Sequence, residues 1–147
     1  VMKQACGALW NLAHKHYANK ARVAAAGGIE AVVRVLGEHH GSLAVMERAR
    51  RALANLACNN AANQGRIAGA GGIEAVVRVL GEHRGSAAVM EQACMALGNI
   101  GWSDKALQKR IKDAGAEPVV RAALAAPDAT HETKKWGQRL LDKLGKV

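Results

Sequence analysis

The sequence contains no phenylalanine and a single tyrosine, although half of its 147 residues are hydrophobic. The apolar residues are mainly alanine, valine and leucine, whose small side chains suit helices that stack closely together. No apolar run approaches the roughly 20 residues needed to cross a bilayer, so we expect no membrane-spanning segment. The length is sufficient for one continuous core rather than for two independent domains.

Cysteine is scarce and odd in number, with Cys6, Cys58 and Cys94 as its three occurrences. All three fall in stretches with helical patterning. We interpret them as small buried apolar residues in a reducing compartment rather than as metal ligands, nucleophiles or disulfide partners. No secretory signal is visible, and the chain begins inside a helical pattern. We therefore expect a fragment of an intracellular protein, located in the cytoplasm, the nucleus or both.

The positive charge is not concentrated in any one part of the chain, although the net charge is +9. Residues 1–44 carry five basic and two acidic side chains, residues 45–88 carry six and three, and residues 89–147 carry ten and seven. Binding to single-stranded nucleic acid uses aromatic side chains interleaved with clustered cations, and this sequence has few aromatics. These features argue against nucleic acid as the partner and leave solubility and steering as roles for the charge.

Motifs that carry chemistry are also missing. The sequence has no phosphate-binding glycine loop, no nucleophile elbow and no set of His, Cys and Asp residues at catalytic spacing. Its carboxylates are scattered singly, and its six histidines include no converging ligand set. We expect no enzymatic activity, no cofactor and no metal site.

The dominant positive signal is an internal repeat. The segment Gly27–His39 recurs letter for letter as Gly71–His83, an offset of 71 − 27 = 44 positions. At the same offset, Asn11, Asn55 and Asn99 occupy one internal position. Self-similarity at this period is typical of solenoids, in which each unit buries its apolar face against its neighbours.

The apolar spacing inside one unit predicts three helices. Apolar residues three and four positions apart indicate a long helix near 45–58, a short one near 61–70 and a third near 73–80. Gly71 ends the short helix where left-handed backbone angles are needed, and Ser86 is the expected N-cap of the next long helix. The sequence therefore predicts an all-α protein.

Two recurring motifs resemble those of armadillo repeat proteins. The motif ALWNLA at 8–13 returns as ALANLA at 52–57 and ALGNIG at 96–101, like the third-helix signature of that family. The motif AGGI at 26–29 and 70–73 is similar to the break between the family's first and second helices. The resemblance implies a right-handed α-solenoid of three-helix repeats.

In that register the chain begins with the third helix of a truncated leading repeat. Two full repeats follow, and the last repeat ends in a polar helix that resembles a cap and carries Lys143 where the others have asparagine. The expected boundaries are 1–16, 17–59, 60–103 and 104–147.

The resemblance also implies a function. Third helices of armadillo proteins line a concave groove, and their recurring asparagine hydrogen-bonds the backbone of an extended peptide. Asn11, Asn55 and Asn99 would take this part. The alternative is that each asparagine binds the backbone of a neighbouring helix and sets the repeat spacing, and the two roles can coexist.

Side chains at −7, −4 and +3 from each asparagine would select the peptide. Family members that bind basic nuclear-import signals carry Trp at −4 with acidic residues nearby, whereas −4 here is Gly, Arg or Met and none of these positions is acidic. Arg48 and Arg51 favour an acidic or phosphorylated segment of another protein, unless they form only a solvated basic face. Besides the asparagines, the predicted groove residues are Gln4, His14, Arg48, Arg51, Gln92, Met95 and Trp102.

Two further features do not fit a simple array. Arg50 stands where other units have Cys6 and Cys94, so we expect it to be half exposed or paired with a carboxylate. The first helix carries apolar residues that would pack on a preceding repeat. Self-association through this edge is the alternative function.

Of the tryptophans, Trp10 and Trp102 are expected near the groove and Trp136 on the last helix.

Overall fold

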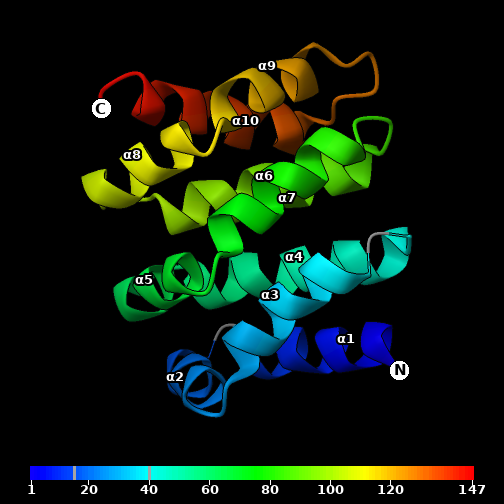
Figure 1. Cartoon of the computed structure of the whole chain (residues 1–147), viewed down its shortest axis with the longest axis vertical. Coiled ribbons are helices and arrows are strands. Elements are labelled where there is room, and N and C mark those ends of the chain that lie inside the picture. Colours follow the sequence, from blue (N-terminus) through cyan, green and yellow to red (C-terminus); the bar gives the residue numbers. More distant parts are fainter. Residues whose placement is uncertain (15, 40) are drawn as a thin grey trace.

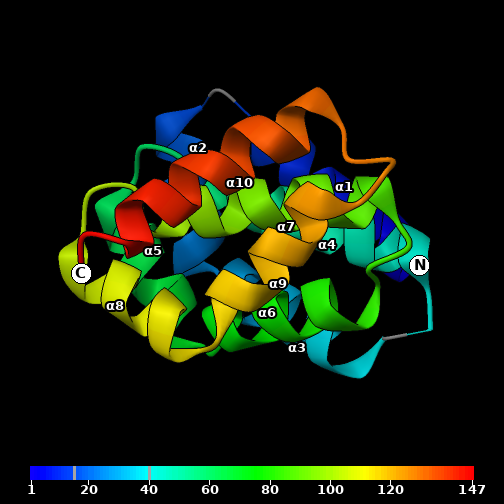
Figure 2. The same ribbon diagram turned by 90° about the horizontal axis from the view of Figure 1, so that it is seen from above.

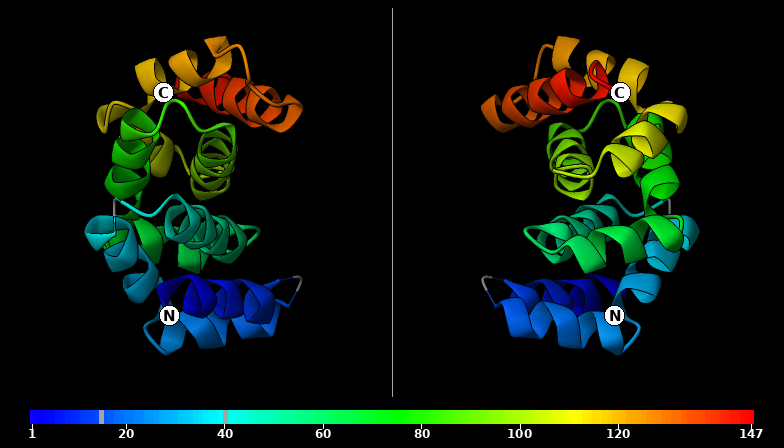
Figure 3. Two further views of the ribbon diagram at one scale, coloured as in Figure 1. Left: turned by 90° about the vertical axis from the view of Figure 1, so that its right-hand side faces the viewer. Right: turned by 90° about the vertical axis from the view of Figure 1, so that its left-hand side faces the viewer.

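The computed structural model describes residues 1–14, 16–39 and 41–147, which leaves Lys15 and His40 undescribed. Within these ranges the chain forms ten α-helices and no strand, so the all-α prediction is confirmed. Figure 1 shows the helices stacked from α1 and α2 at one end to α9 and α10 at the other, with the chain termini at opposite ends in Figure 3. The helices are α1 Met2–Ala13, α2 Tyr17–Ala25, α3 Gly28–Glu38, α4 Leu43–Ala57, α5 Ala61–Gly69, α6 Gly72–Glu82, α7 Ala87–Ile100, α8 Lys105–Asp113, α9 Ala116–Ala125 and α10 His131–Leu144.

The three helices predicted for one unit are present as α4, α5 and α6. The helices also recur at a constant offset, since α3, α6 and α9 begin at Gly28, Gly72 and Ala116. In chain order, α1 is followed by three sets of three helices: α2 to α4, α5 to α7, and α8 to α10. We retain the four repeat boundaries as a proposal.

A left-handed glycine precedes each of α3, α6 and α9. Gly27, Gly71 and Gly115 have φ angles of 79°, 81° and 81°. A side chain is strained at such angles, whereas glycine adopts them readily. The short helix before each glycine therefore ends there, and the chain turns into the next helix.

Side-chain caps define where several of the helices begin. Ser42 and Ser86 each accept a hydrogen bond from the backbone N–H three residues later, which confirms the predicted cap at Ser86. Asp104 and Thr130 do the same for α8 and α10. Each cap satisfies a backbone donor that the helix itself leaves unpaired.

Packing follows the stack. Helix α4 lies between α1 and α7, and α7 lies between α4 and α10, while α3 and α6 pack against α4 and α7. Seen from above in Figure 2, α1, α4, α7 and α10 occupy one side of the molecule and α3, α6 and α9 the other. Leucine, isoleucine, valine, alanine and methionine side chains from all these layers form one buried core. None of the described helices combines the length and the apolar character that a membrane span requires.

Candidate functional site

The predicted groove residues lie on α1, α4 and α7 or just after them. We call the surface that these three helices form together with α10 the groove face. Hollows that contain most of the predicted residues open on this face. A central pocket of about 350 Å³ lies among all four helices, and an N-terminal hollow of about 380 Å³ lies between α1 and α4. The central pocket brings together His14, Arg51, Asn55, Gln92, Met95 and Asn99. The N-terminal hollow holds Gln4, Asn11 and Arg48.

The asparagines form a ladder between helices. Asn55 Nδ2 donates to the carbonyl oxygen of Trp10 at 3.1 Å, and Asn99 Nδ2 donates to that of Ala54 at 2.9 Å. Each bond thus reaches the residue that precedes the asparagine of the previous unit. The structural role that the sequence left open is therefore present. Within the described residues the Oδ1 atoms of Asn55 and Asn99 accept no hydrogen bond and remain available in the central pocket.

Arg51 forms the cationic wall of the central pocket. Its guanidinium carbon lies 4.5 Å from the centroid of the Trp10 ring, and the His14 ring lies 5.0 Å from that of Trp10. An arginine stacked on an aromatic face keeps its N–H groups free at the edges of the plane. The indole ring therefore orients a cation without neutralising it.

Glu91 is a pocket residue that the sequence analysis missed. Its Oε2 accepts a hydrogen bond from the Thr130 hydroxyl at 2.7 Å, and its Oε1 accepts one from Gln92 Nε2 at 3.4 Å. The expectation that no acid stands at −7, −4 or +3 holds, but Glu91 is one residue beyond that set. The signal was available, because a residue next to −7 can share the same helical face.

Trp136 is the second pocket residue that was not among the predicted groove residues. It lies on the last helix, as expected, and lines the central pocket. It occupies the position equivalent to Gln92, since 136 − 92 = 44. Gly98 makes this placement possible: a Cβ there would lie 3.0 Å from the indole Cε3. The indole N–H donates to Glu132 at 3.2 Å, which fixes the ring orientation.

Trp102 lies outside both hollows and is 43% exposed. Its ring meets that of Trp136 edge to face, with centroids 6.5 Å apart. The Lys143 ammonium lies 4.6 Å from the Trp102 ring centroid and donates to the Trp102 carbonyl oxygen. Lys143 replaces the ladder asparagine of the last unit, so the ladder ends here in a cation on an aromatic ring.

Several solved structures that are similar to this chain are designed proteins. One designed armadillo repeat protein has a TM-score of 0.87 and 26% identity over 97% of this chain. A structure of computationally designed armadillo repeat proteins for modular peptide recognition has a TM-score of 0.86 and 25% identity over 97% of this chain. A designed armadillo repeat protein in complex with a (KR)4 peptide has a TM-score of 0.83 and 25% identity over 97% of this chain.

The chain is an armadillo-like repeat protein. It spans 58%, 58% and 57% of the three structures just named. No family model matches the chain, and no curated protein matches it either. The armadillo resemblance seen in the motifs is confirmed by the structures alone.

Arg50 contradicts both expectations for this position. In the armadillo-like stack its side chain is 0% exposed, and none of its three guanidinium nitrogens has a hydrogen-bond partner within the described residues. Burial lowers the pKa of Arg50 to about 10, and the charge of Glu47 offsets part of this effect. Helix α4 is enclosed by α1, α3 and α7. Because of this enclosure, the side chain does not carry its charge to water.

The cysteines follow the prediction at two of three positions. Cys6 and Cys94 are buried, and burial raises the pKa of both thiols, to about 12 for Cys94. Cys58 is half-buried and lines the central pocket, so its interpretation as a core residue is wrong. It stands at +3 from Asn55, on the groove face. In the described ranges no group of three His, Cys, Asp or Glu residues is arranged to hold a metal ion.

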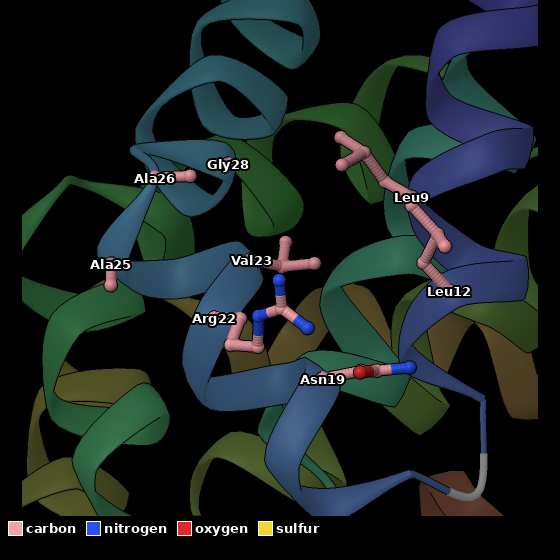
Figure 4. Close-up of a pocket in the computed structure, with 8 residues that line it drawn as sticks. All are labelled: Leu9, Leu12, Asn19, Arg22, Val23, Ala25, Ala26 and Gly28. Carbon is pink, nitrogen blue, oxygen red and sulfur yellow. The ribbon is translucent and has the colours of Figure 1, made fainter.

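A cavity larger than either of these hollows lies at the N-terminal edge rather than on the groove face. It measures about 730 Å³, and Figure 4 shows Leu9 and Leu12 of α1 facing Arg22 and Val23 of α2 across it. Leu12 is 55% exposed, whereas Leu56, its equivalent 44 positions later, is fully buried. This is the surface on which an inner armadillo unit packs against the unit before it.

Proposed function

We propose that this armadillo-like repeat protein binds an extended peptide segment along the groove face. The observation that carries the proposal is the asparagine ladder. Asn55 and Asn99 each donate one N–H to a neighbouring helix, and their side-chain oxygens accept no hydrogen bond from the residues that the structure describes. An amide can accept from a peptide N–H whatever the peptide's side chains are, so the ladder supports binding to the main chain. The named structures include designs for modular peptide recognition, which is consistent with this role.

We further propose that the segment carries acidic side chains. Arg51 and Arg48 line the central pocket and the N-terminal hollow respectively, and neither forms an ion pair within the described residues. An arginine binds a carboxylate or phosphate through two parallel N–H donors. Binding of this kind requires no reaction chemistry, so affinity comes from hydrogen bonds and a few anchoring side chains.

The test is titration of the purified chain with fluorescein-labelled peptides of about ten residues, which extend over roughly 33 Å. A peptide with regularly spaced glutamates is expected to bind, and Asn55→Ala together with Arg51→Gln to weaken binding at least about tenfold. Asn19→Ala is the matched control, because Asn19 lies in the edge cavity and not on the groove face. Equal weakening by the control variant contradicts the groove assignment.

Sedimentation velocity on the same samples distinguishes peptide binding from self-assembly of the chain. A second candidate, assembly through the N-terminal edge, is supported by the edge cavity and by the exposure of Leu12. Concentration-dependent association that Leu12→Glu abolishes, in a chain that binds no peptide, would favour assembly over peptide binding. Strong salt-dependent binding of RNA or DNA would instead favour the nucleic-acid alternative.

A further inference from the structure

We propose that the central pocket selects a segment with charges of both signs, an acidic side chain for Arg51 and a basic one for Glu91. This inference rests on the proposed function, because it specifies which peptide the groove face binds. The mixed-charge segment differs from the purely acidic peptide that Arg48 and Arg51 alone would favour.

The first observation is that the pocket holds two opposite charges that do not neutralise each other. Arg51 and Glu91 line the same cavity from α4 and α7. Within the described residues they form no ion pair with each other or with any other side chain. Elsewhere in the chain opposite charges do pair, as in Arg66 with Glu30 at 2.6 Å.

The second observation is that both charges are held in place from behind. The Trp10 ring supports the guanidinium of Arg51, and the Thr130 hydroxyl anchors the carboxylate of Glu91. Groups held in position lose less conformational entropy when a ligand binds. The pocket therefore presents a fixed donor group on its α4 wall and a fixed acceptor group on its α7 wall.

The third observation is an excess of acceptors on the α7 wall. Gln92 is 8% exposed, and its Oε1 has no hydrogen-bond partner within the described residues, while its Nε2 makes one long bond of 3.4 Å. The free Oδ1 of Asn99 lies on the same wall. A ligand donor such as an ammonium or guanidinium group satisfies these oxygens as well as Glu91, once the Gln92 amide turns toward it.

Peptides with one sign of charge are disfavoured by this arrangement. A purely acidic segment brings a carboxylate toward Glu91, and a purely basic one brings a cation toward Arg51. Like charges at an interface, or a charge that loses water without gaining a partner, oppose binding. Side chains two residues apart lie on the same side of an extended chain, about 7 Å from each other. The preferred pattern is therefore an acidic and a basic residue at positions i and i+2.

The test compares four labelled peptides of equal length on the full chain: Glu only, Lys only, Glu and Lys at i and i+2, and the same composition at i and i+1. We expect the i, i+2 peptide to bind about five- to tenfold tighter than the Glu-only peptide. Glu91→Gln should remove this preference and leave Glu-only binding unchanged or stronger. Its amide oxygen still accepts from Thr130, so the fold is maintained.

Asp128→Asn is the control, since it removes one negative charge from an exposed turn outside the pocket. It should leave the preference intact. Equal affinity of wild type for the Glu-only and i, i+2 peptides overturns the mixed-charge inference but leaves the peptide groove in place. Failure of all four peptides to bind overturns the proposed function itself.

Discussion

Helices α4 and α7 are two copies of one groove helix that bury very different side chains at the same point. Arg50 in α4 and Cys94 in α7 are both 0% exposed. One is a charged group without a hydrogen-bond partner within the described residues, and the other is a small thiol. The comparison teaches that neighbouring helices set the burial of this position, because the stack encloses it whatever residue the helix carries.

The largest expected effect comes from copying the α4 residue into α7. Cys94→Arg should lower the free energy of unfolding by about 3–5 kcal/mol, because it places an unpaired charge and excess volume in a closed site. Urea unfolding followed by circular dichroism measures the change. A decrease in the free energy of unfolding of less than about 1 kcal/mol would show that α7 can open this site to water. The Arg50 and Cys94 positions would then not be equally enclosed.

The reverse change should stabilise the protein. Arg50→Met keeps an unbranched side chain and removes the buried charge, so we expect a gain of about 2–3 kcal/mol in the free energy of unfolding. The same urea experiment measures it. Exposed Arg34→Met is the control, which should change stability by less than about 0.5 kcal/mol.

The pH dependence of this gain follows from the pKa of Arg50, which burial lowers from 12.5 to about 10. Between these two values the unfolded chain binds more protons at this residue than the folded chain. The contribution of Arg50 to stability therefore rises with pH above 10. The stability difference between Arg50→Met and wild type should be constant from pH 7 to 9 and shrink above pH 10. A difference that widens above pH 10 would contradict a buried, charged Arg50.

The ladder asparagines should differ by a smaller amount. Asn99 is buried and Asn55 is half-buried, so Asn99→Ala should cost about 1–2 kcal/mol and Asn55→Ala about 1 kcal/mol or less. Thermal unfolding monitored by circular dichroism ranks the two variants. Equal costs would indicate that water replaces both hydrogen bonds equally well.

The smallest effects are expected at the ion pairs between units. Glu30 pairs with Arg66 at 2.6 Å and Glu74 pairs with Arg110 at 2.9 Å, in equivalent and exposed positions. Glu30→Gln and Glu74→Gln should each change stability by less than about 1 kcal/mol, and by less still at high salt. A large loss in one variant alone would show that the two units are not energetically equivalent.

Much of the fold was predictable because its signals are local. Helix positions follow from apolar residues three and four apart, the left-handed turn at Gly71 from the glycine pair, and the cap at Ser86 from its place before a helix. The repeat then indicated which residues are equivalent. The ladder positions Asn55 and Asn99 followed from that equivalence.

The composition of the site was predicted less well. Six of the predicted residues share the central pocket, but Gln4, Asn11 and Arg48 lie in a separate hollow and Trp102 lies in neither. Glu91 and Trp136 were missed because their place in the pocket depends on contacts across units. Thr130 orients Glu91, and Gly98 admits the Trp136 ring. Both residues stand at or beside the −7 position, so their spacing made them candidates, but only the contacts across units show that they line the pocket.

By itself, the sequence determined the helices, their turns and their order, since these depend on residues within a few positions of one another. Tertiary structure decided the burial of Arg50, the hydrogen bonds that Asn55 and Asn99 make to neighbouring helices, and the placement of Arg51 and Glu91 on different walls of one pocket. The physical reason is that solvent exposure and the electrostatic environment belong to the space between helices. They are set by which helices stack together and how closely they approach.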